Sequence, residues 1–65
     1  MKIEKVYRTI GSYTLLKIEA NYQPYVVAYK YDPQSQSWAQ GHYFCEYLPA
    51  RLDFHKRAIN ERRAV

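Results

Sequence analysis

The amino-acid sequence predicts a small α+β fold in which an antiparallel meander of three or four strands is packed by one C-terminal helix. Three observations support this prediction. Apolar and polar residues alternate in four short segments, turn-forming residues separate these segments, and from Leu48 onward the apolar spacing lengthens from two residues to about three and a half. With 65 residues, the chain has room for a single domain, residues 1–65.

The first two strands are predicted on either side of a short turn. Residues 2–9 alternate weakly and end before Gly11, a residue that readily adopts the positive φ of a turn. Residues 13–20 alternate more clearly and are followed by Pro24, which cannot donate a hydrogen bond to a sheet. These features predict a β-hairpin followed by a break in the sheet.

The next two strands are predicted as a second hairpin. Residues 25–31 read Tyr-Val-Val-Ala-Tyr-Lys-Tyr, which is the clearest strand pattern of the chain. A polar segment headed by Asp32-Pro33 predicts an exposed loop, and residues 38–44 predict the returning strand. Gly41 within that strand indicates a bulge or a close approach of another group to the backbone.

The predicted helix covers residues 48–63 and begins near Pro49, which suits a first helical position because its missing N–H has no intrahelical partner there. It carries two apolar stripes. One consists of Ala50, Phe54 and Ala58, and the other of Leu48, Leu52 and Ile59 with His55 between them. Together they exceed what one sheet face covers, so either the excess contacts the N-terminal strand or a second subunit, or Ala50 is exposed. Asp53, Arg57 and Glu61 predict a solvated, salt-bridged face.

Composition limits the classes of function. The net charge of +4 suits contact with polyanions, and the basic residues gather toward the two ends of the chain. The single Cys45 rules out an internal disulfide, and no apolar run reaches membrane-spanning length. The N-terminal residues mix charges where a signal peptide needs an apolar stretch. We therefore expect a cytoplasmic protein with no membrane contact.

Catalytic and metal sites are not expected. His42, Cys45 and His55 are the only soft metal ligands, and their spacing fits no zinc pattern. A nucleophilic pair of Cys45 with either histidine lacks a recognisable orienting residue or oxyanion element. The sequence thus predicts neither enzyme activity nor a metal or other cofactor.

Strand alternation divides the sheet residues between two faces, which we call the ring face and the small face. The ring face is predicted to hold Tyr13, Leu15, Lys17, Tyr25, Val27, Tyr29, Tyr31, Trp38, Gln40 and His42. The small face is predicted to hold Leu16, Ile18, Val26, Ala28, Ala39, Gly41 and Tyr43. Small residues allow a helix to pack closely, which favours an outward ring face; the reverse, with rings inside and Tyr hydroxyls reaching the edge, stays open.

These faces lead to two hypotheses for a non-catalytic binding module. In the first, aromatic residues of the sheet, or the surplus helix stripe, contact an unknown protein partner or form a homodimer. Its candidate residues are Tyr13, Tyr25, Tyr29, Tyr31, Trp38 and His42. The alternative is an accessory protein that binds nucleic acid through basic residues around the sheet and helix. Its candidate residues are Lys5, Arg8, Lys17, Lys56, Arg62 and Arg63.

A resemblance covers roughly residues 38–58. Trp38, Gly41 and Phe44 resemble the W-x-G-x-F end of the third strand of AP2-type domains, with longer spacing here, and Ala50, Phe54 and Ala58 resemble the stripe that the AP2 helix sets against its sheet. The predicted strands and helix also resemble the N-terminal domains of tyrosine integrases. Like AP2-type domains, these lay a three-stranded sheet into the DNA major groove. The arginine-rich reading strand of AP2 domains has no counterpart in this sequence. The chain also looks like small proteins of bacterial mobile elements, which implies a context and no mechanism.

Overall fold

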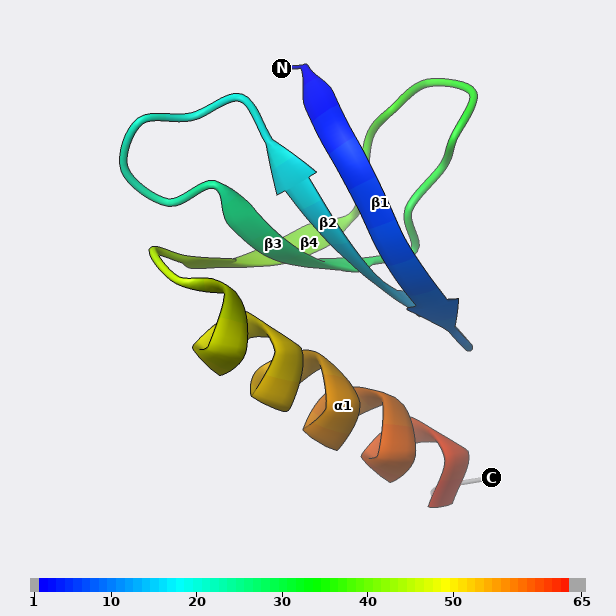
Figure 1. Ribbon diagram of the computed structural model, residues 1–65. Helices are drawn as coiled ribbons and strands as arrows, with labels where there is room; N and C mark the ends of the chain where they lie inside the picture. The colour runs from blue at the N-terminus through cyan, green and yellow to red at the C-terminus, as the bar shows by residue number, and fades with distance from the viewer. Residues whose placement is uncertain (1, 64–65) are drawn as a thin grey trace.

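Four antiparallel strands follow one another across one sheet in chain order, and a single helix lies on one face of the sheet (Figure 1). The structure, a computed structural model, describes residues 2–63, with side chains through Glu61. The elements are β1 (Ile3–Ile10), β2 (Tyr13–Ile18), β3 (Tyr25–Tyr29), β4 (Gln40–Phe44) and α1 (Tyr47–Arg63). The predicted α+β meander with a C-terminal helix is confirmed, and the main differences are earlier ends of β2 and β3 and a later start of β4.

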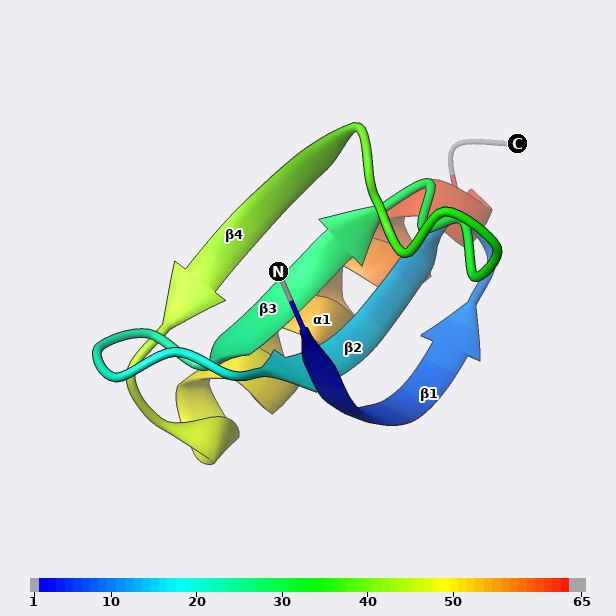
Figure 2. The same cartoon turned by 90° about the horizontal axis from the view of Figure 1, so that it is seen from above.

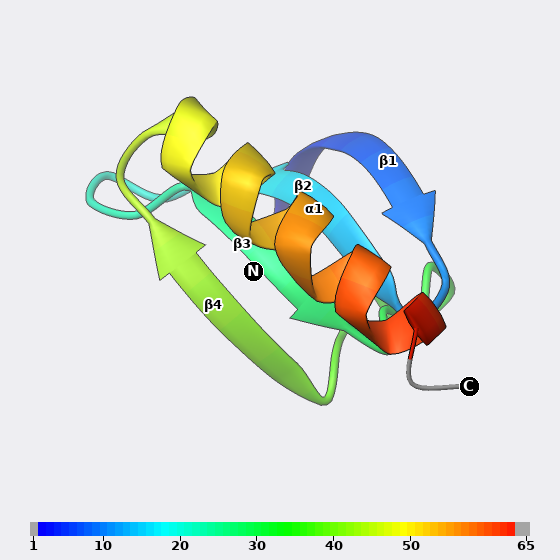
Figure 3. The ribbon, with the colours of Figure 1, turned by 90° about the horizontal axis from the view of Figure 1, so that it is seen from below.

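Helix α1 lies over the middle of the sheet and runs roughly along β2 and β3, as Figure 3 shows from the helix side. The stripe formed by Ala50, Phe54 and Ala58 is buried, each residue being at most 2% exposed. Ala50 and Phe54 pack with Leu15 and Val27 into one core cluster. The small side chains on either side of Phe54 let the helix approach the strands closely. Ala50 is therefore a core residue, and the second apolar stripe is the one left outside.

The prediction that the ring face points outward is wrong. Leu15 and Val27 belong to the ring face, and they contact the helix. The partly buried residues packed around this cluster are Tyr7, Ile10, Tyr13, Tyr25, Phe44 and Tyr47. The physical reason is complementarity of size: the small residues are on the helix, so the bulky rings on the sheet fit around it and keep their hydroxyls near the edge.

The small face forms a second core on the other side of the sheet. Leu16, Ile18, Val26 and Ala28 are each at most 1% exposed, and the hydrophobic residues packed against them are Ile3, Tyr31 and Trp38. Figure 2 shows that the segment between β3 and β4, drawn in green, folds back near this face. Both faces of this short sheet are therefore covered, one by α1 and the other by a loop and the start of β1.

Tyr31 and Trp38 do not lie on the ring face, because both residues lie outside the strands, in the segment between β3 and β4. Lys30 has a φ of 56°, which breaks the alternation after Tyr29, and Trp38 precedes the start of β4. Their ring centroids lie 6.3 Å apart on the small-face side. The indole Nε1–H of Trp38 donates a hydrogen bond to Tyr43 Oη at 3.2 Å.

The tip of the β1–β2 hairpin is tied to the C-terminal part of α1. The backbone N–H of Ser12 donates to Glu61 Oε1 at 2.8 Å. Gly11 has a φ of 59°, and a Cβ at this position would collide with the same carboxylate oxygen. The predicted solvated face of α1 is thus partly structural: Arg57 and Asp53 form the expected i, i+4 ion pair, whereas Glu61 anchors the helix to the hairpin.

Candidate binding groove between β1 and the helix

Strand β1 is irregular, and this irregularity brings its polar side chains to the helix side of the sheet. Its pairing with β2 shifts register between Ile3 and Lys5 and again between Val6 and Arg8. A bulge of this kind re-aims side chains relative to simple alternation. As a result Lys5 pairs with Lys17, Arg8 pairs with Leu15, and Tyr7 packs with the core under the helix.

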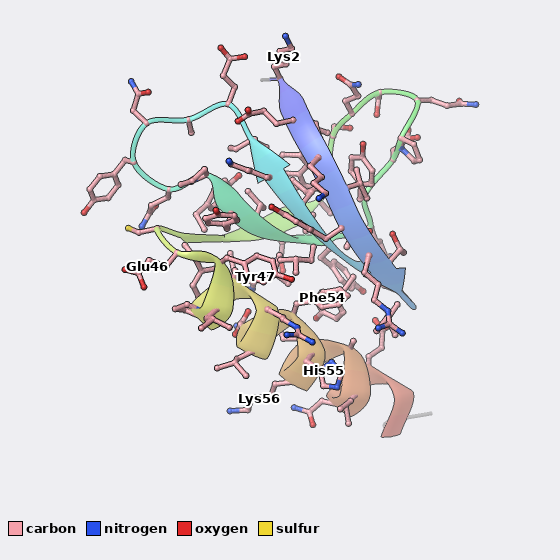
Figure 4. All side chains as sticks on the ribbon, viewed as in Figure 1. Lys2, Glu46, Tyr47, Phe54, His55 and Lys56 are labelled. Atoms are coloured by element: carbon pink, nitrogen blue, oxygen red, sulfur yellow. The ribbon has the colours of Figure 1, made fainter. Side chains whose placement is uncertain are left out.

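A groove of about 340 Å³ opens between β1 and the N-terminal half of α1. Its lining residues are Tyr7, Arg8, Leu15, Tyr47, Arg51, Phe54 and His55. Leu15 and Phe54 are only 2% exposed, so the floor of the groove is the hydrophobic core itself. Figure 4 shows Tyr47 and Phe54 between helix and sheet, whereas His55 and Lys56 lie on the parts of the helix that face solvent.

The walls of the groove are built from tyrosine rings. The ring centroid of Tyr47 lies 5.1 Å from that of Tyr7 and 5.8 Å from that of Tyr25. Lys5 Nζ lies 4.9 Å from the centroid of Tyr7, and Lys17 Nζ lies 5.7 Å from that of Tyr25. Such contacts of a cation with a ring face are attractive. Tyr7 and Tyr47 line the groove, Tyr25 continues the row of rings beside it, and the two lysines lie next to each other on paired strands at one side of this row.

The groove is positively charged, and no carboxylate lines it. Of the residues that the structure describes, only Arg57 and Asp53 form an ion pair, with Nε and Oδ2 2.7 Å apart. The hydrogen bond from Arg57 to that carboxylate raises the pKa of Arg57 above its ordinary value, so this cation stays charged and engaged. The exposed side chains of Arg8, Arg51 and His55 are left to face solvent at the rim. The unpaired guanidinium groups of Arg8 and Arg51 beside the rings favour an anionic, aromatic ligand.

The predicted nucleic-acid residues fall into three groups. Lys5, Arg8 and Lys17 come together at or beside the groove. Lys56 points away from the sheet on the outer side of α1 (Figure 4). The side chains of Arg62 and Arg63 lie outside the part that the structure describes.

The predicted protein-contact residues do not form one surface. Tyr13 and Tyr29 have ring centroids 5.2 Å apart and line a hollow near Arg57 at the C-terminal part of α1. Tyr25 belongs to the row of rings beside the groove, and His42 pairs with Val27 and is half-buried on the helix side. Tyr31 and Trp38 pack on the opposite face. Alternation alone therefore grouped side chains that folding separates.

Four groove residues were missed by the sequence reasoning. Tyr47, Arg51 and His55 stand at i, i+4 and i+8 of the helix, and this spacing on one helix side is a signal that was available in the sequence. Tyr7 had no such signal, because the register shift in β1 decides which way it points.

The described residues form neither a metal site nor a membrane-spanning helix. Cys45 is exposed, and within residues 2–61 no three histidine, cysteine or acidic side chains lie close enough together to hold a metal ion. In the described part of the chain, no helix has the length and apolar character needed to cross a membrane. The groove is thus the arrangement with the clearest chemistry.

No family model, no curated protein and no solved structure matches this chain. The resemblance to AP2-type domains and the link to mobile elements therefore stay predictions.

Proposed function

We propose that this protein is a non-catalytic module that binds single-stranded nucleic acid in the groove between β1 and α1. One observation carries the proposal: the rings of Tyr7 and Tyr47, the cations Arg8 and Arg51 and the imidazole of His55 line a single groove with no carboxylate among them. Aromatic side chains stack on bases of any sequence, and cations contact the phosphates between them.

The two sides of the groove suit two different contacts. Arg8 comes from β1 and Arg51 from α1, so a phosphate backbone that runs along the groove meets a cation on each side. The rings of Tyr7 and Tyr47 offer an aromatic surface to a base, and the neighbouring Lys5 and Lys17 add positive potential beside it. The groove volume of about 340 Å³ fits a single nucleobase site better than a duplex.

A single strand is favoured over double-stranded DNA for a second reason. The small face, which is the sheet face turned away from α1, is packed with apolar side chains under Tyr31 and Trp38. Such a face offers few cations for the phosphates of a duplex. On the outer side of α1, Leu48 and Leu52 are both more than 60% exposed, and these two side chains have no hydrogen-bonding groups for base edges.

The test is fluorescence anisotropy with labelled oligothymidylate and oligouridylate at a series of salt concentrations. For contacts to three or four phosphates, affinity is expected to fall about 20- to 50-fold between about 50 and 200 mM salt. Arg51→Gln should weaken binding about tenfold at low salt and reduce the salt slope by about 0.7, because one phosphate contact is lost. Tyr7→Leu keeps an apolar side chain on the core and should weaken binding about fivefold or more through lost stacking.

Lys2→Gln is the matched control, because it removes the same formal charge at the far end of β1 from the helix (Figure 4). It should leave the affinity nearly unchanged. Equal losses of affinity in Lys2→Gln and Arg51→Gln would indicate general charge attraction and contradict the groove as the binding site. A duplex that competes as well as the single strand would contradict the choice of ligand, and absence of binding at low salt would end the proposal.

A further inference from the structure

The second apolar stripe of α1 lies on the outer surface of the molecule. Leu48 is 62% exposed, Leu52 69% and Ile59 40%, and they stand at i, i+4 and i+11 of one helix side with His55 at i+7. Beside them is a shallow hollow of about 460 Å³ lined by Leu48, Arg51, Leu52, His55 and Lys56. Exposed apolar residues that form one contiguous stripe mark an interaction surface more often than scattered ones do.

The rim of this stripe is basic. Arg51 and Lys56 line the hollow beside the leucines, and no acidic side chain does. The acidic residues of the helix are engaged elsewhere, Asp53 with Arg57 and Glu61 with the backbone of Ser12. The surface therefore combines an apolar stripe with unpaired positive charge.

This charge pattern decides between two occupants of the stripe. A second copy of the chain would bring its own Arg51 and Lys56 to the same stripe, next to those of the first copy, whether the two helices paired parallel or antiparallel. Like charges across such an interface are destabilising.

We propose that this stripe is a docking site for an acidic amphipathic helix of another protein. The spacing i, i+4, i+7, i+11 is the pattern by which one helix packs its apolar side along another. An apolar side chain of the partner enters the hollow between Leu48 and Leu52, and glutamate or aspartate side chains flanking it contact Arg51 and Lys56. This surface is distinct from the ring wall of the groove, although Arg51 and His55 border both.

The probe is a fluorescein-labelled peptide of three heptads with leucine at positions a and d and glutamate at positions e and g. Anisotropy should show saturable binding of this peptide and much weaker binding of a matched peptide with lysine in place of every glutamate. Leu52→Gln should weaken binding of the acidic peptide about tenfold or more, because its side chain is buried only in the complex. Lys56→Glu should weaken binding of the acidic peptide and strengthen binding of the lysine peptide.

Val6→Gln is the control substitution, since Val6 is 46% exposed on β1 and lies outside the stripe. It should leave peptide binding unchanged, and circular dichroism melting should show that both glutamine variants stay folded. Equal binding of the two peptides, or no effect of Leu52→Gln, would overturn the proposal. So would a homodimer in sedimentation equilibrium that Leu52→Gln abolishes, or Leu52-dependent binding to anionic phosphatidylglycerol vesicles without binding of the acidic peptide.

Discussion

The contact between the β1–β2 hairpin and the end of α1 can be tested by a double-mutant cycle on Gly11 and Glu61. Gly11 has a φ of 59°, and an added Cβ would collide with the Glu61 oxygen that accepts the hydrogen bond from Ser12 N–H. Gly11→Ala therefore acts in two ways. It strains the backbone directly, and it displaces the carboxylate that ties the helix to the hairpin.

The two contributions have different magnitudes and different dependence on Glu61. An L-residue other than glycine in this left-handed conformation costs about 1 kcal/mol or slightly more. Loss of the partly buried, charge-assisted hydrogen bond costs about another 1 kcal/mol. We expect Gly11→Ala to lower the free energy of unfolding by about 2 kcal/mol in the wild-type background and by about 1 kcal/mol in a Glu61→Ala background. These are large fractions of the roughly 3–10 kcal/mol total expected for a chain of this length.

The assay is equilibrium urea unfolding followed through the fluorescence of Trp38, the only tryptophan of the chain. Four proteins complete the cycle: wild type, Gly11→Ala, Glu61→Ala and the double variant. A coupling energy near 1 kcal/mol supports a direct contact between the two positions. Equal costs of Gly11→Ala in the two backgrounds would refute the reasoning, because the alanine would then act through backbone strain alone.

Two further predictions concern the two cores. Phe54→Ala should lower the free energy of unfolding by about 3–5 kcal/mol because its ring is 2% exposed, whereas Leu52→Ala, at a residue 69% exposed, should change it by less than about 0.5 kcal/mol in the same urea titration. Gly41→Ala should cost about 1–3 kcal/mol, because its Cβ would lie 2.7 Å from Trp38 Nε1 and force the indole off its hydrogen bond to Tyr43. A shift in Trp38 emission should accompany that loss, and an unchanged spectrum and stability would contradict the packing described for the small face.

Much of the fold was predictable because its signals are local. The alternation in residues 13–18 and 25–29, the turn at Gly11 and the proline at the start of the helix each limit the backbone within a few residues. The stripe of Ala50, Phe54 and Ala58 also followed from helical spacing, although that spacing left open which of the two stripes is buried. These features depend little on what packs against them.

The orientation of the sheet was not predictable in the same way. Both sheet faces are apolar enough to be buried, and both are buried in the structure. Which face receives the helix depends on how side-chain sizes match across the interface, between Ala50 on the helix and rings such as Tyr25 on the sheet. The positions of Tyr31 and Trp38 depend on left-handed conformations at Lys30 and Gln36 in the segment that joins β3 to β4. The alternation of residues along a strand predicts neither the sheet face that receives the helix nor the positions of these two rings.

The sequence by itself determined the elements, their order and the chemistry available: a tyrosine-rich sheet, a helix with two apolar stripes and basic residues toward both ends. Only the tertiary structure decided which of these residues meet. The groove joins Tyr7 and Arg8 of a bulged strand to Tyr47 and Arg51 of a helix some forty residues later. The physical reason is that contacts between distant segments follow from the packing of whole faces and from the register of β1, whereas the elements themselves follow from local backbone preference.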